Sequence, residues 1–305
     1  MAETMQPLSI GELLDRAIQL YRKHFGLFSG IAAWPFGCVL ALQILSAFYM
    51  AAPIATAPVS VNSAATMPST TAVGYALGIA GLNFLIAIMT IFATAYVNGG
   101  TIVAVSSFLR EQPFTVSQTW PSLKGSLWRI MRTAFLAGLY AFIPVICLGI
   151  VILLSPPLTV IGRLFFIVLF LLTIVLAIWI YLRYAMGVPA TVIEKVNARE
   201  SLRRSARLSE GFRGRIFLAY LLIVVLELIF YAVAAGLGAI LGVFHPGNAM
   251  LLGRIMPFVS YGINVLVLPF ASIPIALIYF DLRVRKEGWD LELLLDKKTE
   301  GHATA

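Results

Sequence analysis

The sequence has no charged residue and no histidine between Gly26 and Leu109. Charged residues make up only 12% of the 305 residues, apolar residues make up 60%, and the mean hydropathy is +0.92. A soluble domain carries roughly 25% charged and about 45–50% apolar residues. The shortage of charge therefore excludes an ordinary water-facing surface and indicates a protein that lies in a membrane.

Residues that usually carry catalysis are also scarce. His24, His245 and His302 are the only histidines, and none falls in an apolar run. The two cysteines, Cys38 and Cys147, lie inside apolar runs without metal-ligand spacing. The chain has no GxSxG motif, no P-loop and no dinucleotide-binding glycine motif. We therefore expect no enzymatic activity, no metal and no cofactor.

Six apolar segments are each long enough to cross a bilayer, which takes about 20 residues of helix. The predicted fold is an all-α, polytopic membrane helix bundle with three hairpins and cytoplasmic amphipathic helices. The uncharged segment 51–71 predicts an exported loop, and Asn98-Gly99-Gly100 predicts a break or bend in the second span. The predicted spans cover residues 27–49, 72–97, 131–154, 164–185, 216–241 and 256–280.

The orientation follows from the basic residues, because loops rich in Lys and Arg stay in the cytoplasm. With both termini inside, only Arg163 and Arg254 of the 22 Lys and Arg lie near outer loops, which leaves 20 inside. We expect a multi-pass protein of the bacterial inner membrane, with one membrane domain over 1–296 and a polar tail over 297–305. The net charge of +8 then reflects topology and attraction to lipid headgroups. Membrane lipids and other membrane proteins are the expected partners, and nucleic acid is not.

Residues 9–25 predict an amphipathic helix. Ser9 and Glu12 form a capping-box pattern, and apolar residues recur after them at helical spacing. Such a helix lies on the cytoplasmic surface of the membrane or docks under the bundle. Similar basic and aromatic entries precede spans one, three and five. They predict either a threefold repeat of one partly polar helix and two spans, or only the basic and aromatic entries that any membrane hairpin has.

A basic surface helix is predicted over 198–210, starting after Asn197 and ending at Gly211. Its arginines fall largely on one side of the helix, where each charge would add about 1 kcal/mol of attraction to anionic lipid. The alternative is that these charges only enforce the topology. The candidate contacts to anionic lipid are Arg199, Arg203, Arg204 and Arg207.

The end of the last span carries a similar structural signal. Asp281 and Arg285 are spaced to pair along one helix, and Gly288 is placed to end that helix. Asp290 would start another short amphipathic helix. We interpret this segment as an anchor for the cytoplasmic face.

Several of these motifs resemble the bacterial membrane domain found beside glycerophosphodiester phosphodiesterases. The resemblance implies a six-helix membrane module of undefined activity. It carries no catalysis over, because the chain has no room for the soluble phosphodiesterase barrel, which needs roughly 250 residues. The motifs lie at 10–16, 20–25, 188–194, 201–211 and 279–291.

Glu227 is the one acid in the middle of a predicted span, and ionisable groups there point to a function by default. Tyr231 and small residues continue its helical face, and Asn83 and Asn264 lie at comparable depth. These residues predict either a proton or cation site or a neutral carboxyl that hydrogen-bonds within the bundle. Two functions therefore remain: a non-catalytic module that organises lipid or partner proteins, and a transporter of a small molecule or lipid built around Glu227.

Overall fold

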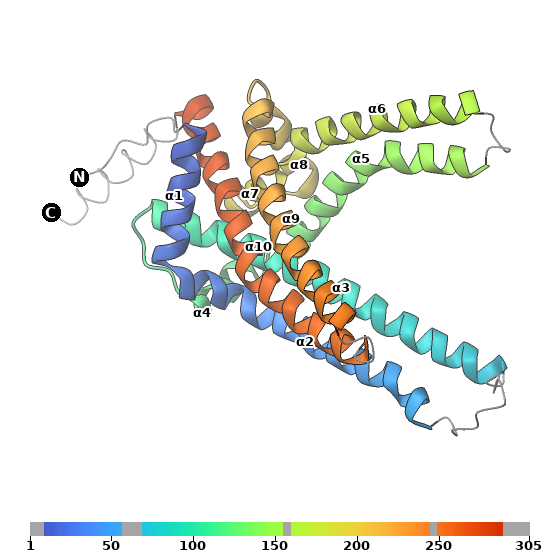
Figure 1. Ribbon diagram of the computed structural model, residues 1–305. Coiled ribbons are helices and arrows are strands. Elements are labelled where there is room, and N and C mark those ends of the chain that lie inside the picture. The colour runs from blue at the N-terminus through green and yellow to red at the C-terminus, as the bar shows by residue number, and fades with distance from the viewer. Residues whose placement is uncertain (1–8, 57–68, 155–159, 245–248, 289–305) are drawn as a thin grey trace.

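The computed structural model describes residues 9–56, 69–154, 160–244 and 249–288 (Figure 1). Within these ranges the regular elements are all α-helices, and six of them are long and apolar enough to span a membrane. The predicted all-α, polytopic membrane fold is confirmed. The predicted outer turns at 155–157 and 244–248, the helix after Asp290 and the tail 297–305 lie wholly or largely outside the described residues.

The long helices pair in sequence order into three hairpins, and the two helices of each hairpin contact each other. A short helix precedes each hairpin, as the predicted repeat requires, and one additional short helix, α7 (Gly187–Glu194), comes before the third unit. The first unit is α1 (Ile10–Lys23), α2 (Phe25–Thr56) and α3 (Ser69–Leu109). The second is α4 (Val116–Leu123), α5 (Leu127–Leu154) and α6 (Val160–Tyr184). The third is α8 (Ala198–Ser209), α9 (Arg213–Phe244) and α10 (Ala249–Glu287).

The three hairpins meet at one end, and toward the other end the α5/α6 hairpin diverges from the α2/α3 hairpin, along which α10 lies (Figure 1). We call the closed end the base: it consists of α1, α4, α7 and α8 with the adjoining ends of the long helices. Fully buried side chains such as Phe28, Ile102, Met186 and Tyr279 lie in or next to this region. The α2/α3 and α5/α6 hairpins extend away from it as separate arms that expose large apolar side chains, for example Phe84 and Phe165. An apolar surface of this kind suits contact with lipid chains.

α10 is the central helix of the bundle. It contacts α1, α2, α3, α7, α8 and α9, and its second half is almost continuously buried from Ala271 to Leu282. Pro257, Pro269 and Pro274 lie within it without ending it. Membrane helices tolerate such prolines because neighbouring groups satisfy the freed carbonyls.

The predicted break at Asn98-Gly99-Gly100 is wrong, because α3 runs through it to Leu109. The two glycines instead allow close packing. A Cβ on Gly99 would lie 3.0 Å from Ile130 Cδ1, and one on Gly100 would lie 2.6 Å from Thr119 Cγ2. The predicted loop 51–71 is also too long, since α2 extends to Thr56 and α3 begins at Ser69.

The predicted capping box at the first helix is confirmed. The backbone N–H of Glu12 donates to Ser9 Oγ at 3.2 Å, and the Ser9 N–H donates to Glu12 Oε2 at 2.6 Å. The hydrogen bond from the Ser9 backbone N–H lowers the pKa of the Glu12 carboxyl most, and the Ser9 hydroxyl lowers it further. Leu13 and Ala17 are buried, and Tyr21 donates to the Leu266 carbonyl at 2.9 Å. The helix therefore docks against α10 in the bundle.

Candidate functional site: the polar base and its cavity

α8 docks through a face of serines. Ser201, Ser205 and Ser209 follow one another at four-residue spacing and are fully buried. Ser205 Oγ donates to the Arg183 carbonyl and accepts from the Met186 N–H, both at 3.0 Å. Ser209 Oγ also donates to the Arg183 carbonyl, at 3.1 Å. These hydroxyls satisfy backbone groups that the end of α6 would otherwise leave without partners.

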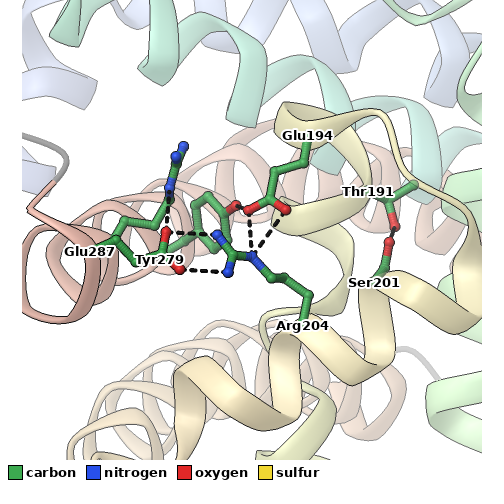
Figure 2. A network of polar contacts seen from close by, with 7 residues as sticks. Thr191, Glu194, Ser201, Arg204, Tyr279 and Glu287 are labelled. Atoms are coloured by element: carbon green, nitrogen blue, oxygen red, sulfur yellow. Dashed lines mark hydrogen bonds and ion pairs between the residues drawn. The ribbon is translucent and has the colours of Figure 1, made fainter. Parts of the chain in front are cut away.

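A second row of hydroxyls joins α8 to α7 and α5. Thr191 Oγ1 donates to Ser201 Oγ at 2.7 Å and lies 2.8 Å from Thr133 Oγ1. All three side chains are fully buried, and Figure 2 shows Thr191 and Ser201 pointing toward each other. Short polar side chains of this kind let helices approach closely and bond across the interface. The result is a tightly fitted contact between three helices.

Ion pairs connect α7, α8 and α10 beside these hydroxyls (Figure 2). Arg204 Nε donates to Glu194 Oε1 and Oε2 at 2.9 and 3.0 Å, and Arg204 Nη2 donates to Glu287 Oε2 at 2.6 Å. The Tyr279 hydroxyl donates to Glu194 Oε1 at 2.6 Å. Burial lowers the pKa of Arg204, but the hydrogen bonds and charges of Glu194 and Glu287 outweigh it and raise that pKa overall. Glu194 and Glu287 therefore stabilise the charged form of the Arg204 guanidinium.

A further ion cluster closes α9 onto α10. Arg285 Nε lies 2.9 Å from Asp281 Oδ2, which confirms the predicted pair, and Arg215 Nη2 lies 3.3 Å from the same oxygen. Lys286 Nζ donates to the carbonyls of Arg207 and Glu210 at 2.6 and 2.7 Å, at the end of α8. A cation at a helix C-terminus is favourable for the helix dipole.

The predicted helix ends are found as well. Gly211 and Gly288 have φ of +83° and +65°, a conformation that glycine adopts without strain. Asn197 is the N-cap of α8, but its side chain makes no capping hydrogen bond.

The four arginines predicted to contact anionic lipid do not behave alike. Arg199, Arg203 and Arg207 are exposed on α8. Arg204 is the exception, because Glu194 and Glu287 hold its guanidinium in the base. The lipid contacts at all four arginines stay predictions, and for Arg204 the two carboxylates would compete with a lipid headgroup. The sequence analysis did not identify the serine face of α8, although the four-residue spacing of its serines is visible in the sequence.

A cavity of about 160 Å³ lies where the hairpins converge. In its lining, Ser272 Oγ donates to Asn98 Oδ1 at 2.6 Å, and the Tyr220 hydroxyl donates to the Ala185 carbonyl at 3.4 Å. The lining comes from α3, α5, α6, α7, α9 and α10, so that every hairpin contributes to it. The sequence analysis interpreted Asn98 only as part of a helix break, although a polar residue within a span is itself a sign of a functional site.

The predicted midplane set is not joined by hydrogen bonds. Asn83 donates to the Ile79 carbonyl at 3.0 Å and Asn264 donates to the Ser260 carbonyl at 2.7 Å, each within its own helix. Tyr231 is exposed. Glu227 is half-buried on α9, and its carboxyl has no hydrogen-bond partner within the described ranges.

Glu227 shares a helical face with one residue of the cavity lining. It follows Tyr220 by seven residues, so both lie on one face of α9. Tyr181 and Tyr220 pack edge to face with ring centroids 5.6 Å apart. The acid therefore lies two helical turns from Tyr220 of the cavity.

No group of three or more His, Cys, Asp or Glu in the described part of the chain is placed to hold a metal ion. The chain matches no family model, no curated protein and no solved structure at a significant level. The resemblance to the membrane domain of the phosphodiesterases stays a prediction from its motifs. Three of those five motif segments meet in space, since Glu194, Arg204 and Glu287, which form the ion pairs, and Tyr279, which donates to Glu194, come from them.

Proposed function

We propose that the protein is a non-catalytic module of the bacterial inner membrane that organises lipid between its hairpins, with the base at the cytoplasmic face. The observation that carries the proposal is the contrast between the two ends of the bundle. Ion pairs and buried hydroxyls hold the base together, while the arms diverge and expose apolar side chains (Figure 1). Such a shape keeps apolar faces apart for lipid chains to fill. The motif resemblance to a membrane module of undefined activity agrees with this proposal.

An apolar groove between α2 and α10 supports the same function. It encloses about 190 Å³ and is lined by Ile44, Ala47, Phe48, Pro257 and Phe258. The side chains named are all apolar, and the lining is predominantly apolar, which suits an acyl chain.

Photo-crosslinking tests the proposal. The full chain is reconstituted with phospholipid that carries a diazirine in its acyl chain, and crosslinked residues are identified by mass spectrometry. Lipid that resides in the groove should label Phe48 and Phe258 in preference to Leu77 and Phe84, which are exposed on α3 and do not line the groove. Equal labelling of both pairs would mean that the groove holds no resident lipid, and the proposal would fail.

The orientation has its own test. In a chain with both native cysteines replaced by alanine, a cysteine at Ser63 should react with an impermeant reagent from outside the cell. A cysteine at Arg203 should react only after the membrane is opened. The reverse pattern would place the base outside.

Transport remains the second candidate, because Glu227, an acid in mid-span, shares one face of α9 with Tyr220 of the cavity lining. Proteoliposomes with a pH gradient and an internal pH indicator would reveal proton flux. Glu227→Gln removes titration while keeping nearly the same shape, so it should abolish any flux that runs through this carboxyl. Flux that survives the substitution would remove Glu227 from the transport path.

A further inference from the structure

Arg183 and Arg213 lie at the boundary between the base and the arms, and they differ in their partners from the ion-paired arginines of the base. Arg213, the first residue of α9, places its guanidinium over the ring of Trp179 on α6, with Cζ 4.5 Å from the ring centroid. Arg183 lies one turn after Trp179 on the same face of α6, and its guanidinium lies 5.9 Å from the Tyr184 ring. Arg213 therefore covers the Trp179 ring, and Arg183 lies one helical turn farther along the same face of α6, at the seam between α6 and α9.

Neither charge is neutralised. Arg204, Arg215 and Arg285 each have a carboxylate within 3.3 Å, whereas no carboxylate of the described residues pairs with Arg183 or Arg213. The Nε–H groups of Arg183 and Arg213 are also buried without a hydrogen-bond acceptor. A buried N–H donor without an acceptor costs free energy. Contact with an aromatic ring attracts a guanidinium but does not neutralise its charge. The site has donors and charge but lacks the acceptor.

The surface of α6 next to this pair is apolar. Val168, Leu172 and Val175 precede Trp179 at spacings of four and three residues, so they form one stripe that leads away from the base. They are 57%, 61% and 64% exposed. The seam therefore presents two cations, an indole ring and then a long apolar track, in the order that an anionic phospholipid matches with its phosphate and acyl chain.

We infer that Arg183 and Arg213 bind the phosphate of an anionic phospholipid whose acyl chain lies along the Val168–Val175 stripe of α6. Guanidinium groups bind phosphate oxygens through paired N–H donors, which the terminal Nη groups provide. Basic pockets between membrane helices on the cytoplasmic side are suited to such headgroups. The inference rests on the proposed lipid-organising function and specifies the headgroup chemistry and its position.

The full chain in nanodiscs provides the test, with brominated phosphatidylglycerol or brominated phosphatidylcholine added as quenchers of tryptophan fluorescence. Phosphatidylglycerol should quench at lower mole fraction, and Trp179→Phe should remove the component that differs between the two lipids. Replacing both arginines by glutamine removes two charges worth a factor of about five each, so the apparent affinity for phosphatidylglycerol should fall about 25-fold. The matched control is Arg132→Gln, an exposed arginine near the start of α5, which should change it little.

Three results would overturn the inference: equal quenching by the two lipids in the wild-type chain, an unchanged affinity in the double variant, and an equal loss with Arg132→Gln. Inorganic phosphate at millimolar concentration distinguishes the sources of the phosphate group, since complete displacement of the lipid would assign the site to a soluble phosphate. If the double variant does not fold, the wild-type comparison of the two lipids decides. Retained crosslinking at Phe48 and Phe258 without a preference for anionic lipid would refute this inference alone, and loss of both would refute the proposed function as well.

Discussion

Replacing Arg204 by methionine should destabilise the base. The substitution keeps much of the side-chain volume but leaves Glu194 and Glu287 facing each other without their shared cation. Breaking a buried ion pair by removing one partner costs about 3–5 kcal/mol, and an exposed pair contributes about 0–1 kcal/mol. The three side chains are 28%, 20% and 26% exposed, which lies between these limits, and we expect a loss of about 2 kcal/mol in the free energy of unfolding.

Equilibrium unfolding in mixed micelles with increasing SDS would measure this loss. Arg203→Met is the matched control, because Arg203 is the neighbouring residue of α8 and is exposed. Its effect should stay within about 0.5 kcal/mol, as is usual for surface substitutions. A double-mutant cycle of Arg204→Met with Glu194→Gln should show coupling, since neutralising the carboxylate relieves part of the repulsion that Arg204→Met creates.

The reasoning fails if Arg204→Met destabilises no more than Arg203→Met. It also fails if the cycle is additive, because the two groups would then not act on each other. Either result would mean that the hydroxyl contacts of α8 hold the base without the ion pairs.

Three further predictions concern packing, lipid binding and pH. Gly100→Ala should destabilise the fold by about 1–3 kcal/mol, because the added Cβ would lie 2.6 Å from Thr119 Cγ2, and the same SDS titration measures it. Replacing Arg203 and Arg207 by glutamine should weaken salt-sensitive binding to vesicles of anionic lipid, and unchanged binding would leave these charges only the orientation role. Because the folded-state pKa of Glu12 is lowered, its contribution to stability is complete above its ordinary pKa of 4.5 and is lost as the pH falls through the lowered value. Acid should therefore release α1 with a weaker pH dependence in Glu12→Gln than in the wild-type chain. The rate at which a cysteine placed in that helix reacts measures the release.

The spans could be predicted because long uncharged runs have few alternatives to a membrane helix. Helix ends that depend on local chemistry were equally accessible, as the Ser9 capping box and the left-handed Gly211 show. The error at Asn98-Gly99-Gly100 arose because glycine weakens a helix in isolation, whereas inside a bundle the missing side chains allow Thr119 and Ile130 to pack closely.

The site was less accessible than the fold. Asp281 and Arg285 are four residues apart, so their pair is visible in one helix, but the partners of Arg204 lie 10 and 83 residues away. Such contacts follow from how α7, α8 and α10 meet and not from any local pattern. Glu227 and Asn264 looked related because both lie in mid-span, yet the Asn264 amide is satisfied by its own helix.

Distance measurement between the arms tests the central claim, that a closed base holds the hairpins apart in the membrane. Spin labels at Leu85 on α3 and Val168 on α6, in the full chain reconstituted into lipid bilayers, report the separation by double electron–electron resonance. The account predicts a separation well beyond the roughly 8–10 Å between packed helices, and a shorter one in Arg204→Met once the base loosens. Arms that lie in contact in the wild-type bilayer sample would contradict it.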